Sequence, residues 1–330
     1  MKILFFSRRF YPSIGGVEKH SFEIAKRLVK LGHCVSVITE GKEFNTNEYN
    51  GIVVYSIPVK FCEKLKKFEI WLWLFKNRKI IECSDIVHCH DVFFWYIPFR
   101  FLYPDKKIFV TFHGWEGVFP PSFSAKIIRK ISEKLSRGNI CIGDYLSKWY
   151  GTKPDVVSYG AVSENADSKK KETDILFIGR LEKDTGLPVY LEVFKKLEKD
   201  IKIVFLGDGV LRNEAKKYGE VLGFVENVQE YIKGARFVFT SGYLSILESF
   251  INKKLVFSVY ENSLKEDYLQ MSPFRDWIVL EKNPVFLLQK VKYYLNNKSK
   301  VNKNIELAYD WGKEQTWTKL TSQYLELWEK

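Results

Sequence analysis

Short apolar runs alternate with amphipathic segments along the first half of the chain. The run at 2–6 is followed, after Gly15 and Gly16, by a segment at 17–31 whose apolar residues recur at near-helical spacing. Gly32 then provides a helix C-cap. Further runs of strand type lie at 34–39, 52–57, 85–90, 107–112, 139–142 and 155–159. This strand–helix alternation predicts a parallel α/β sheet.

A polar stretch at 163–174 has no apolar period and predicts an interdomain linker or a long exposed connection. The alternation then begins again, with predicted strands at 174–179, 201–207, 236–241 and 254–259. Helices are expected at 187–198, 210–218, 244–252 and 284–296, and a Trp-rich helical tail at about 305–330. The pattern therefore predicts two α/β halves, as a length of 330 residues also suggests.

Composition agrees with a folded protein, because 46% of the residues are hydrophobic and 16% aromatic. No apolar run reaches the roughly 18–20 residues of a spanning helix, and the N-terminus lacks a signal peptide pattern. We therefore expect a cytoplasmic protein, soluble or peripheral on the inner face of a membrane. The net charge of +12 implies an anionic partner. The five cysteines show no CxxC and are expected as reduced thiols.

The segment 60–80 carries seven basic residues against two acidic ones, around a Trp-rich apolar centre. A basic helix with Trp at the interface can lie on an anionic membrane. One helical face would then hold Leu65, Phe68, Leu72 and Phe75. The alternative is a core helix of the first domain with solvated lysines. Nucleic acid is not an expected partner, since no recognised binding motif is present.

Glycines at strand ends are candidates for phosphate binding. Gly15 and Gly16 lie just before a helix, whose N-terminus favours an anion, although a flexible turn is the alternative. Gly179 and Arg180 end a strand, and ligands in open α/β sheets collect at the carboxyl ends of strands. Arg180 is placed to hold phosphate bidentately. Its alternative role is a surface pair with Glu182.

The loop Gly207-Asp208-Gly209 repeats this strand–turn–helix arrangement and can lie against a nucleotide base or simply turn the chain. Glu248 raises a different question, because it sits between Leu247 and Phe250 in an apolar helix. A carboxylate there is costly to desolvate unless a hydrogen bond compensates it. Either a neighbour in the fold or a ligand must supply that bond.

The histidines were considered as metal ligands and as site groups. His88 and His90 share one face of a predicted strand, but no third ligand at metal spacing is evident, so no metal site is predicted. His113 lies just past a strand end beside Gly114, a position typical of a site and also of a turn. The chain contains no Asp-x-Asp, no GxSxG and no HExxH, which disfavours hydrolases and metalloproteases.

In this order, these pieces resemble glycosyltransferase family four, retaining enzymes of the GT-B fold. The likeness covers nearly the whole chain. It is carried by YPSIGGVEKHSFEIAKRLVKLGHCVSVIT, DIVHCHD, TFHGWEG, ICIGDYLSKWYGTKPDVVSYGAV, FIGRLEKDTGL, FLGDG, LGFVENVQEYIKGARFVFTSGYLSILESF and YDWGKEQTWTKLTSQYLELWEK. The resemblance implies an α/β fold with two Rossmann-like parallel-sheet domains facing across a cleft.

The family pattern also implies roles for matching residues. Gly15 and Gly16 would approach the donor diphosphate, and His113 would contact the transferred sugar. Arg180 would hold the diphosphate, and Glu248 would accept hydrogen bonds from the nucleotide ribose, which would be the ligand bond that its position requires. The remaining donor contacts implied by the resemblance are Gly179, Gly209, Gly242, Tyr243 and Leu244.

Three positions depart from the family pattern. Thr240 stands where the family has the first Glu of Glu-x7-Glu, and Thr185 stands where a basic residue precedes the glycine. Tyr159 replaces the usual Asn. Lys183 could substitute for the missing basic residue by reaching from the same loop. These departures imply an unusual donor sugar, a weak enzyme or an inactive one.

The expected domains are an acceptor domain at 1–162, a nucleotide-sugar donor domain at 163–305 and a C-terminal helix at 306–330 packing toward the first domain. The expected function is transfer of a hexose, with retention, from a nucleotide-diphosphate sugar to a glycan or a polyprenyl- or lipid-linked acceptor. No metal and no cofactor are expected. The alternative is an inactive nucleotide-binding homologue that acts as a partner subunit. A nicotinamide-dependent oxidoreductase is disfavoured, because GxGxxG is absent after the first strand.

Overall fold

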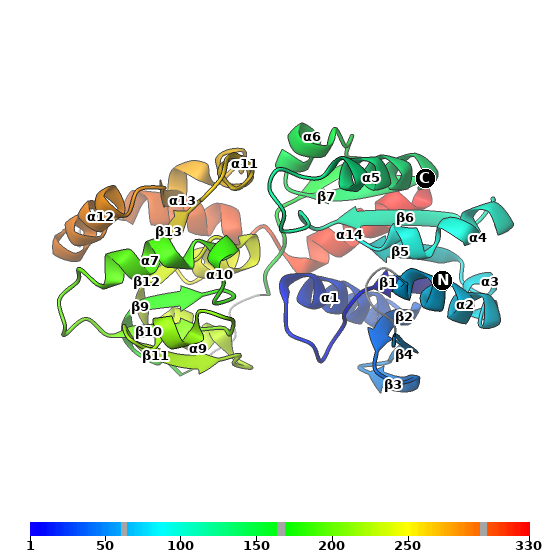
Figure 1. Ribbon diagram of the computed structural model, residues 1–330, viewed down its shortest axis with the longest axis horizontal. Helices are drawn as coiled ribbons and strands as arrows, with labels where there is room; N and C mark the ends of the chain where they lie inside the picture. The colour runs from blue at the N-terminus through cyan, green and yellow to red at the C-terminus, as the bar shows by residue number, and fades with distance from the viewer. Residues whose placement is uncertain (61–64, 164–168, 298–301) are drawn as a thin grey trace. The chain divides into compact units, whose positions relative to one another are not determined.

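The chain folds into two compact α/β units, as the sequence predicts (Figure 1). Unit 1 comprises Met1–Ser158 and Trp317–Lys330, and unit 2 comprises Tyr159–Thr316. The computed structural model describes four stretches of the chain: residues 1–60, 65–163, 169–297 and 302–330. Part of the predicted linker, part of the basic segment 60–80 and Cys62 lie outside these described residues. The four described cysteines are free thiols.

Unit 1 is built on an eight-stranded sheet with the order β3-β4-β2-β1-β5-β6-β7-β8, in which only β3 is antiparallel to its neighbour. Its strands are β1 (Lys2–Ser7), β2 (Cys34–Gly41), β3 (Asn45–Tyr49), β4 (Ile52–Pro58), β5 (Ile86–His90), β6 (Lys107–Phe112), β7 (Gly138–Ile142) and β8 (Val156–Ser158). Its helices are α1 (Gly16–Lys30), α2 (Lys66–Lys76), α3 (Lys79–Glu82), η1 (Phe93–Trp95), α4 (Ile97–Leu102), α5 (Phe123–Leu135), α6 (Tyr145–Tyr150) and α14 (Trp317–Glu329).

Unit 2 is built on a six-stranded parallel sheet with the order β11-β10-β9-β12-β13-β14. Its strands are β9 (Thr173–Ile178), β10 (Ile203–Leu206), β11 (Glu220–Gly223), β12 (Ala235–Phe239), β13 (Leu255–Val259) and β14 (Ile278–Glu281). Its helices are η2 (Lys183–Thr185), α7 (Leu187–Phe194), α8 (Arg212–Ala215), α9 (Val228–Gly234), α10 (Tyr243–Ile251), α11 (Ser263–Gln270), η3 (Arg275–Trp277), α12 (Pro284–Asn296) and α13 (Asn302–Gly312).

Each sheet changes winding direction beside its first strand. Unit 2 has the order 3-2-1-4-5-6, and the parallel strands of unit 1 begin with the same order before adding one strand. In such doubly wound sheets ligands bind at the carboxyl ends of the strands where the order reverses. These positions are the ends of β1 and β5 in unit 1 and of β9 and β12 in unit 2.

Three edge strands were not predicted, because they are polar or short. β3 reads NTNEY, is mostly exposed and forms the antiparallel edge of its sheet. β11 and β14 have only four residues each, and in β14 only Ile278 and Leu280 are buried. An edge strand pairs with only one neighbouring strand and is partly open to solvent, so its sequence needs fewer apolar residues.

The tail differs from the single helix expected at 306–330. It contains two helices, and the break between them follows Gly312. Gly312 lies against α10, since a Cβ added there would come within 3.1 Å of Phe250 Cβ. Only α14 belongs to unit 1, whereas α13 packs on α10 in unit 2.

The apolar face expected on the basic segment is not part of the core. Leu65, Phe68, Leu72 and Phe75 are all exposed, whereas α2 packs inward through Ile70 and Leu74. This arrangement contradicts the core-helix interpretation for those four side chains. Contact of this segment with a membrane stays a prediction.

A buried hydrogen bond anchors α14 to the sheet of unit 1. Trp328 donates its indole N–H to His88 Nδ1 at 3.0 Å, and His88 lies on the central strand β5. Trp317, on the same helix, is equally buried, but its indole N–H has no hydrogen-bond partner among the described residues. The two tryptophans therefore form a matched pair that differs in one polar contact.

We expect Trp328→Phe to destabilise the protein by roughly 1–3 kcal/mol more than Trp317→Phe. Both changes remove similar apolar volume, but only the first leaves the buried His88 Nδ1 without its donor. Urea unfolding of the two variants, with equal m-values, gives the difference directly. Equal loss of stability would mean that this hydrogen bond does not anchor α14.

Candidate functional site

The N-terminus of α1 follows the loop after β1, as predicted for an anion site. Gly15 is the N-cap and Gly16 is the first helical residue. A Cβ on Gly15 would lie 2.1 Å from a carboxylate oxygen of Glu18, so that carboxylate already lies at the helix N-terminus. Glu at this position commonly caps a helix. A phosphate at Gly15 and Gly16 requires Glu18 to rotate away, and the phosphate role stays a prediction.

Four of the five histidines gather in unit 1 near the carboxyl ends of β1, β5 and β6. His88 and His90 come from β5, His20 from α1, and His113 follows β6. The rings of His20 and His113 lie 4.6 Å apart in an edge-on arrangement. The sequence predicts only that His88 and His90 share one strand face. In the folded unit, His20, Tyr324 and the tryptophans of α14 join them in one cluster of ring contacts and hydrogen bonds.

A directed hydrogen-bond chain fixes the protonation of this cluster. Because the Trp328 indole can only donate, His88 Nδ1 accepts and His88 Nε2 carries the proton. His88 Nε2 then donates to Thr111 Oγ1 at 2.8 Å. Thr111 Oγ1 accepts from His88, so its own hydrogen is free to donate to the Tyr324 hydroxyl oxygen at 2.8 Å. The Tyr324 hydroxyl in turn donates to His20 Nε2 at 2.9 Å.

His113, the predicted sugar contact, pairs with His90 through a 2.9 Å hydrogen bond between its Nε2 and His90 Nδ1. Its backbone N–H donates to Asp91 Oδ1 at 2.9 Å, which orients the strand end. Burial lowers the pKa of His113 to about 3, and also places the pKa values of His20, His88 and His90 well below their usual range. At neutral pH His113 is therefore an uncharged imidazole suited to hydrogen bonding.

Sequence reasoning did not find Arg129, which holds the loop after His113. Its guanidinium is buried, donates to the Gly114 carbonyl at 2.6 Å and pairs with Glu116 at 3.1 Å. It also lies 3.9 Å from the centre of the Tyr150 ring. Since α5 bears Arg129, this helix fixes the backbone beside the predicted sugar contact.

In unit 2, the predicted glycine turns lie at the carboxyl ends of β9 and β10 in direct contact. A Cβ on Gly207 would meet the Gly179 carbonyl oxygen at 1.9 Å, and a Cβ on Gly209 would meet the Leu181 carbonyl oxygen at 2.5 Å. Gly207 and Gly209 also have φ values of +139° and +157°. These glycines are therefore required for two loops to pack backbone to backbone, whatever they bind.

Arg180 ends the same turn with its side chain mostly exposed. It pairs with Asp184 at 2.7 Å, rather than with Glu182 as the alternative had it. The Glu182 carboxylate instead accepts from the Val210 backbone N–H at 3.1 Å. Thr185 donates its hydroxyl to the carbonyls of Arg180 and Glu182 and thus shapes the loop. Asp184 therefore neutralises the guanidinium that was predicted to hold the diphosphate.

A second cation near Arg180 comes from a distant part of the sequence. A Cβ on Gly186 would lie 2.1 Å from Val259 Cγ2, so the Arg180 loop packs on the end of β13, just before α11. From α11, Lys265 interacts electrostatically with Arg180, Asp184 and Glu261. Burial, and secondarily Arg180, lower the pKa of Lys265 to about 8. Lys183, the expected substitute, is exposed.

Glu248 lies in α10 with only 7% of its surface exposed, as its apolar neighbours predict. Gly242 is the N-cap of this helix. Tyr243 donates its backbone N–H to the Tyr268 hydroxyl at 3.0 Å, and the two rings stack with centroids 3.8 Å apart. Leu244 lies against Gly160, where a Cβ would come within 2.8 Å of it. The donor contacts assigned to these residues stay predictions.

Thr185 and Thr240, the two threonines that depart from the family pattern, both make hydrogen bonds within unit 2. Thr240 is buried, and its carbonyl accepts from the Ser258 hydroxyl at 2.6 Å. Within the described residues no group of three or more His, Cys, Asp and Glu side chains could hold a metal ion. The same residues include no helix long and apolar enough to cross a membrane.

Two Rossmann-like units with glycine turns at the carboxyl edges of both sheets define the GT-B class of glycosyltransferase folds. Residues 14–156 match the family model described as Glycosyltransferase Family 4.

Similar proteins support the same class. The chain is 23% identical to the GPI3 subunit of phosphatidylinositol N-acetylglucosaminyltransferase from Saccharomyces cerevisiae, over 61% of this chain and 51% of that protein. The matched region thus spans about half the length of that relative. An uncharacterized glycosyltransferase of Methanocaldococcus jannaschii is 21% identical over 97% of this chain and 96% of its own.

A solved structure with the same fold is that of Anabaena HepE in complex with UDP and glucose. It has a TM-score of 0.74 and 12% identity, covering 99% of this chain and 98% of that one. At this identity the likeness establishes the fold.

We expect the free energy of unfolding to fall as the pH is lowered below about 6.5, the pKa of histidine in an unfolded chain. The four clustered histidines have lowered pKa values when folded, so the unfolded state binds more protons there. Each buried histidine contributes at most about 1.4 kcal/mol per pH unit. Urea unfolding of wild type and His20→Gln from neutral pH to pH ~5 measures this slope.

The His20→Gln variant should show a shallower dependence on pH, by up to one proton. This comparison separates the histidine from Asp91, whose pKa desolvation raises to about 6 and whose effect has the opposite sign. His33→Gln is the control for a histidine outside the cluster, since His33 is mostly solvated and its Nδ1 contacts the N-terminal amine. An unchanged slope in His20→Gln would contradict burial of a neutral ring.

Proposed function

We propose that the chain transfers a hexose from a nucleotide-diphosphate sugar, with retention at the anomeric carbon, to a glycan or lipid-linked acceptor. The observation that carries the proposal is the pair of cations, Arg180 and Lys265, at the carboxyl edge of the unit 2 sheet. They lie where a doubly wound sheet binds its ligand. The bound UDP and glucose of HepE support a uridine nucleotide as the first donor to test.

In the proposed reaction the bond between the anomeric carbon and the diphosphate oxygen breaks. An acceptor oxygen forms the new bond on the same face of the sugar and loses its proton. Negative charge develops on the departing nucleoside diphosphate. Arg180 can bind it bidentately, and Lys265 adds a second positive charge in a partly desolvated position, so no metal is required for this role.

In this proposal Asp184 is the partner of Arg180 before the donor binds. In the structure it pairs with Arg180 at 2.7 Å, so the diphosphate must replace it as the partner of the guanidinium. An exposed ion pair of this kind is weak, about 0–1 kcal/mol, and a dianionic diphosphate can displace it. The pair keeps Arg180 near its binding position while the donor is absent.

Glu248 would accept hydrogen bonds from the two ribose hydroxyls. Its 7% exposure makes an ionised carboxylate there sensitive to the loss of any hydrogen-bond donor. In unit 1, the neutral His113 would hydrogen-bond the transferred sugar, and its position is held by Asp91 and by the loop that Arg129 fixes. Unit 1 is assigned the acceptor.

The alternative function is a nucleotide-binding subunit that has lost transfer. One observation favours it, because the yeast relative is itself named as a subunit of its enzyme. The alternative predicts that UDP or another nucleotide binds without turnover of any donor.

We expect Arg180→Ala to lower kcat by about 100- to 1,000-fold, because it removes a charge that stabilises the leaving diphosphate. Lys265→Ala should lower kcat by roughly 10- to 100-fold, because Lys265 adds a positive charge near the diphosphate but does not bind it bidentately as Arg180 does. Transfer from a panel of nucleotide sugars is measured by release of the nucleoside diphosphate. Proton NMR of the product gives the anomeric configuration.

Lys217→Ala is the matched control, since Lys217 is an exposed lysine of unit 2 paired only with Glu214. Lys183→Ala in the same assay decides between the two lysines. A loss with Lys183→Ala as large as that with Lys265→Ala would overturn the assignment of Lys265. Inversion of the anomeric carbon would overturn retention but leave the donor site standing.

We also expect UDP to raise the stability of the wild type and to raise that of Glu248→Gln much less. A ligand at 100 times its dissociation constant adds about 2.7 kcal/mol. Loss of the ribose contact weakens binding by about 10- to 100-fold, which removes most of that gain. Thermal unfolding with increasing UDP measures both, and Glu226→Gln, an exposed glutamate of unit 2, is the control.

A further inference from the structure

Helix α5 presents its apolar side to solvent. Phe123 is 78% exposed, and Ile127, Ile128 and Ile131 are between 39% and 47% exposed. The residues that this helix buries are instead polar, namely Arg129 and Ser132. An ordinary surface helix has the opposite arrangement, with an apolar stripe toward the core. The exposed stripe of α5 is therefore not explained by packing within unit 1.

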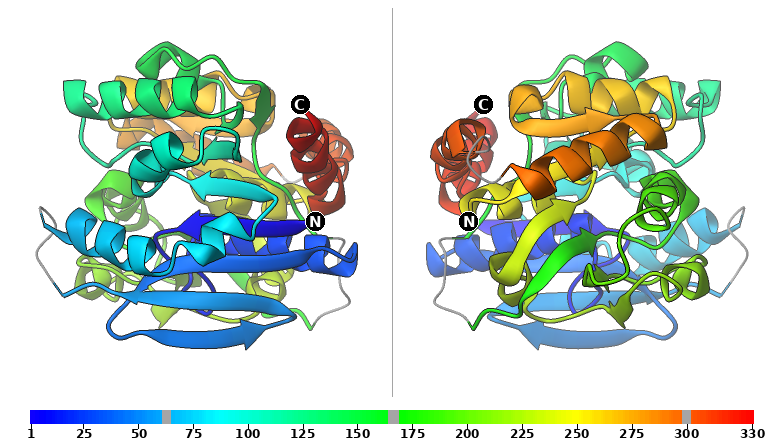
Figure 2. Two further views of the ribbon diagram at one scale, coloured as in Figure 1. Left: turned by 90° about the vertical axis from the view of Figure 1, so that its right-hand side faces the viewer. Right: turned by 90° about the vertical axis from the view of Figure 1, so that its left-hand side faces the viewer.

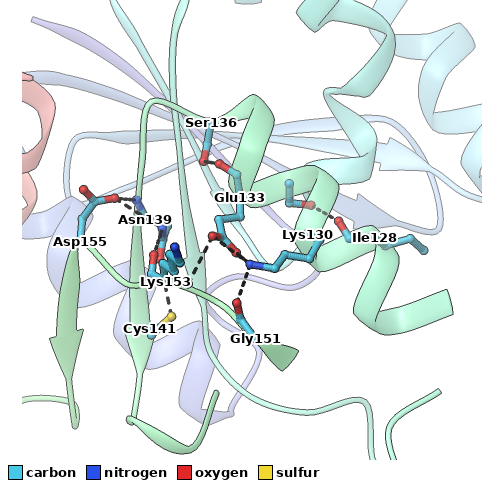
Figure 3. A network of polar contacts seen from close by, with 10 residues as sticks. Ile128, Lys130, Glu133, Ser136, Asn139, Cys141, Gly151, Lys153 and Asp155 are labelled. Atoms are coloured by element: carbon cyan, nitrogen blue, oxygen red, sulfur yellow. Dashed lines mark hydrogen bonds and ion pairs between the residues drawn. The ribbon is translucent and has the colours of Figure 1, made fainter. Parts of the chain in front are cut away.

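Polar contacts hold α5 in this orientation. The Arg129 guanidinium is enclosed by Gly114, Glu116 and the Tyr150 ring on the inner side of the helix. On the same helix, Lys130 bonds the Glu133 carboxylate and the Gly151 carbonyl (Figure 3). Rotating the isoleucines inward would break these bonds and bury Lys130 or Lys134. The outward apolar stripe is thus a stable feature of the fold.

A second apolar stripe lies on the same face of unit 1. It is the face of α2 formed by Leu65, Phe68, Leu72 and Phe75, all exposed. Helices α2 and α5 both contact η1, which places them on one side of the sheet. α14 lies on the other side (Figure 2, left). Helix α4, which also contacts η1, ends in the exposed Phe101 and Leu102.

Lysines border the stripe of α5. On α5, positions Lys126, Lys130 and Lys134 follow one another at intervals of four, beside the row Phe123, Ile127 and Ile131. Helix α5 carries four basic residues and one acidic residue, Glu133, which is paired with Lys130. An apolar stripe edged by long cationic side chains is typical of a helix that lies in a lipid interface.

We propose that this face of unit 1, defined as the exposed apolar side chains of α2 and α5 with the lysines of α5, binds an anionic lipid bilayer. The side chains of Phe123, Ile127 and Ile131 enter the acyl boundary, and Lys126 and Lys134 contact lipid phosphates. The apolar area provides the insertion, and the positive charge selects anionic headgroups. A patch with this charge disfavours a second copy of the chain, because its own lysines would face one another.

The proposal is tested by sedimentation of the full chain with vesicles of phosphatidylcholine, with and without about one third phosphatidylglycerol, at about 0.1 M salt. Wild type should bind only the anionic vesicles. The double variant Ile127→Ser, Ile131→Ser should partition at least tenfold less, and so should Lys126→Glu, Lys134→Glu. The matched control is Val285→Ser, Phe286→Ser, which removes two exposed apolar side chains from α12 of unit 2 and should bind as wild type does.

Three results would overturn the proposal. These are equal binding of wild type to neutral and anionic vesicles, unchanged binding of both α5 variants, and a dimer in solution that only the isoleucine variant dissociates. The last result would assign the face to pairing between copies. Vesicle binding is measured without donor or acceptor, so its outcome is independent of whether the chain transfers a sugar.

Discussion

The hydrogen bond from Trp328 to His88 ties the last helix of the chain to the centre of the first sheet, and much of unit 1 depends on it. It sets the polarity of the hydrogen-bond chain through Thr111 and Tyr324 to His20, while burial lowers the pKa of His88 and His20 and keeps both rings neutral. An imidazolium anywhere in this chain would lose an acceptor and remain buried. The same buried surroundings leave His113 an uncharged hydrogen-bonding group at the strand ends.

Unit 2 brings cationic side chains together at the carboxyl edge of its parallel sheet. The loops after β9 and β10 touch through glycine backbones, and Gly186 places the Arg180 loop on the end of β13. Close approach of these loops, rather than proximity in sequence, brings Lys265 beside Arg180 and Asp184. In the proposed donor site, the positive charge that Thr185 does not supply would come from Lys265.

Helix α5 links the two roles proposed for unit 1. Its inner side carries Arg129, which fixes the loop beside His113, and its outer side carries the apolar stripe proposed to meet lipid. The buried Arg129 Nη2 bonds the Gly114 carbonyl and the Glu116 carboxylate, and the guanidinium lies over the Tyr150 ring, so these contacts keep the polar side of the helix inward. A lipid-linked acceptor would then be presented to the unit that is assigned to bind it.

The local elements and the class of fold follow from the sequence. Apolar runs and glycine turns predict nearly every central strand, because a strand buried on both faces is mostly apolar. The sequence also singled out Arg180, His113 and Glu248. Only the folded structure shows that α14 returns to unit 1, that four histidines meet, that Lys265 joins Arg180 and Asp184, and that the apolar stripe of α5 faces outward. Local periodicity shows that a helix has two faces, but only the packing of distant segments determines which face is covered.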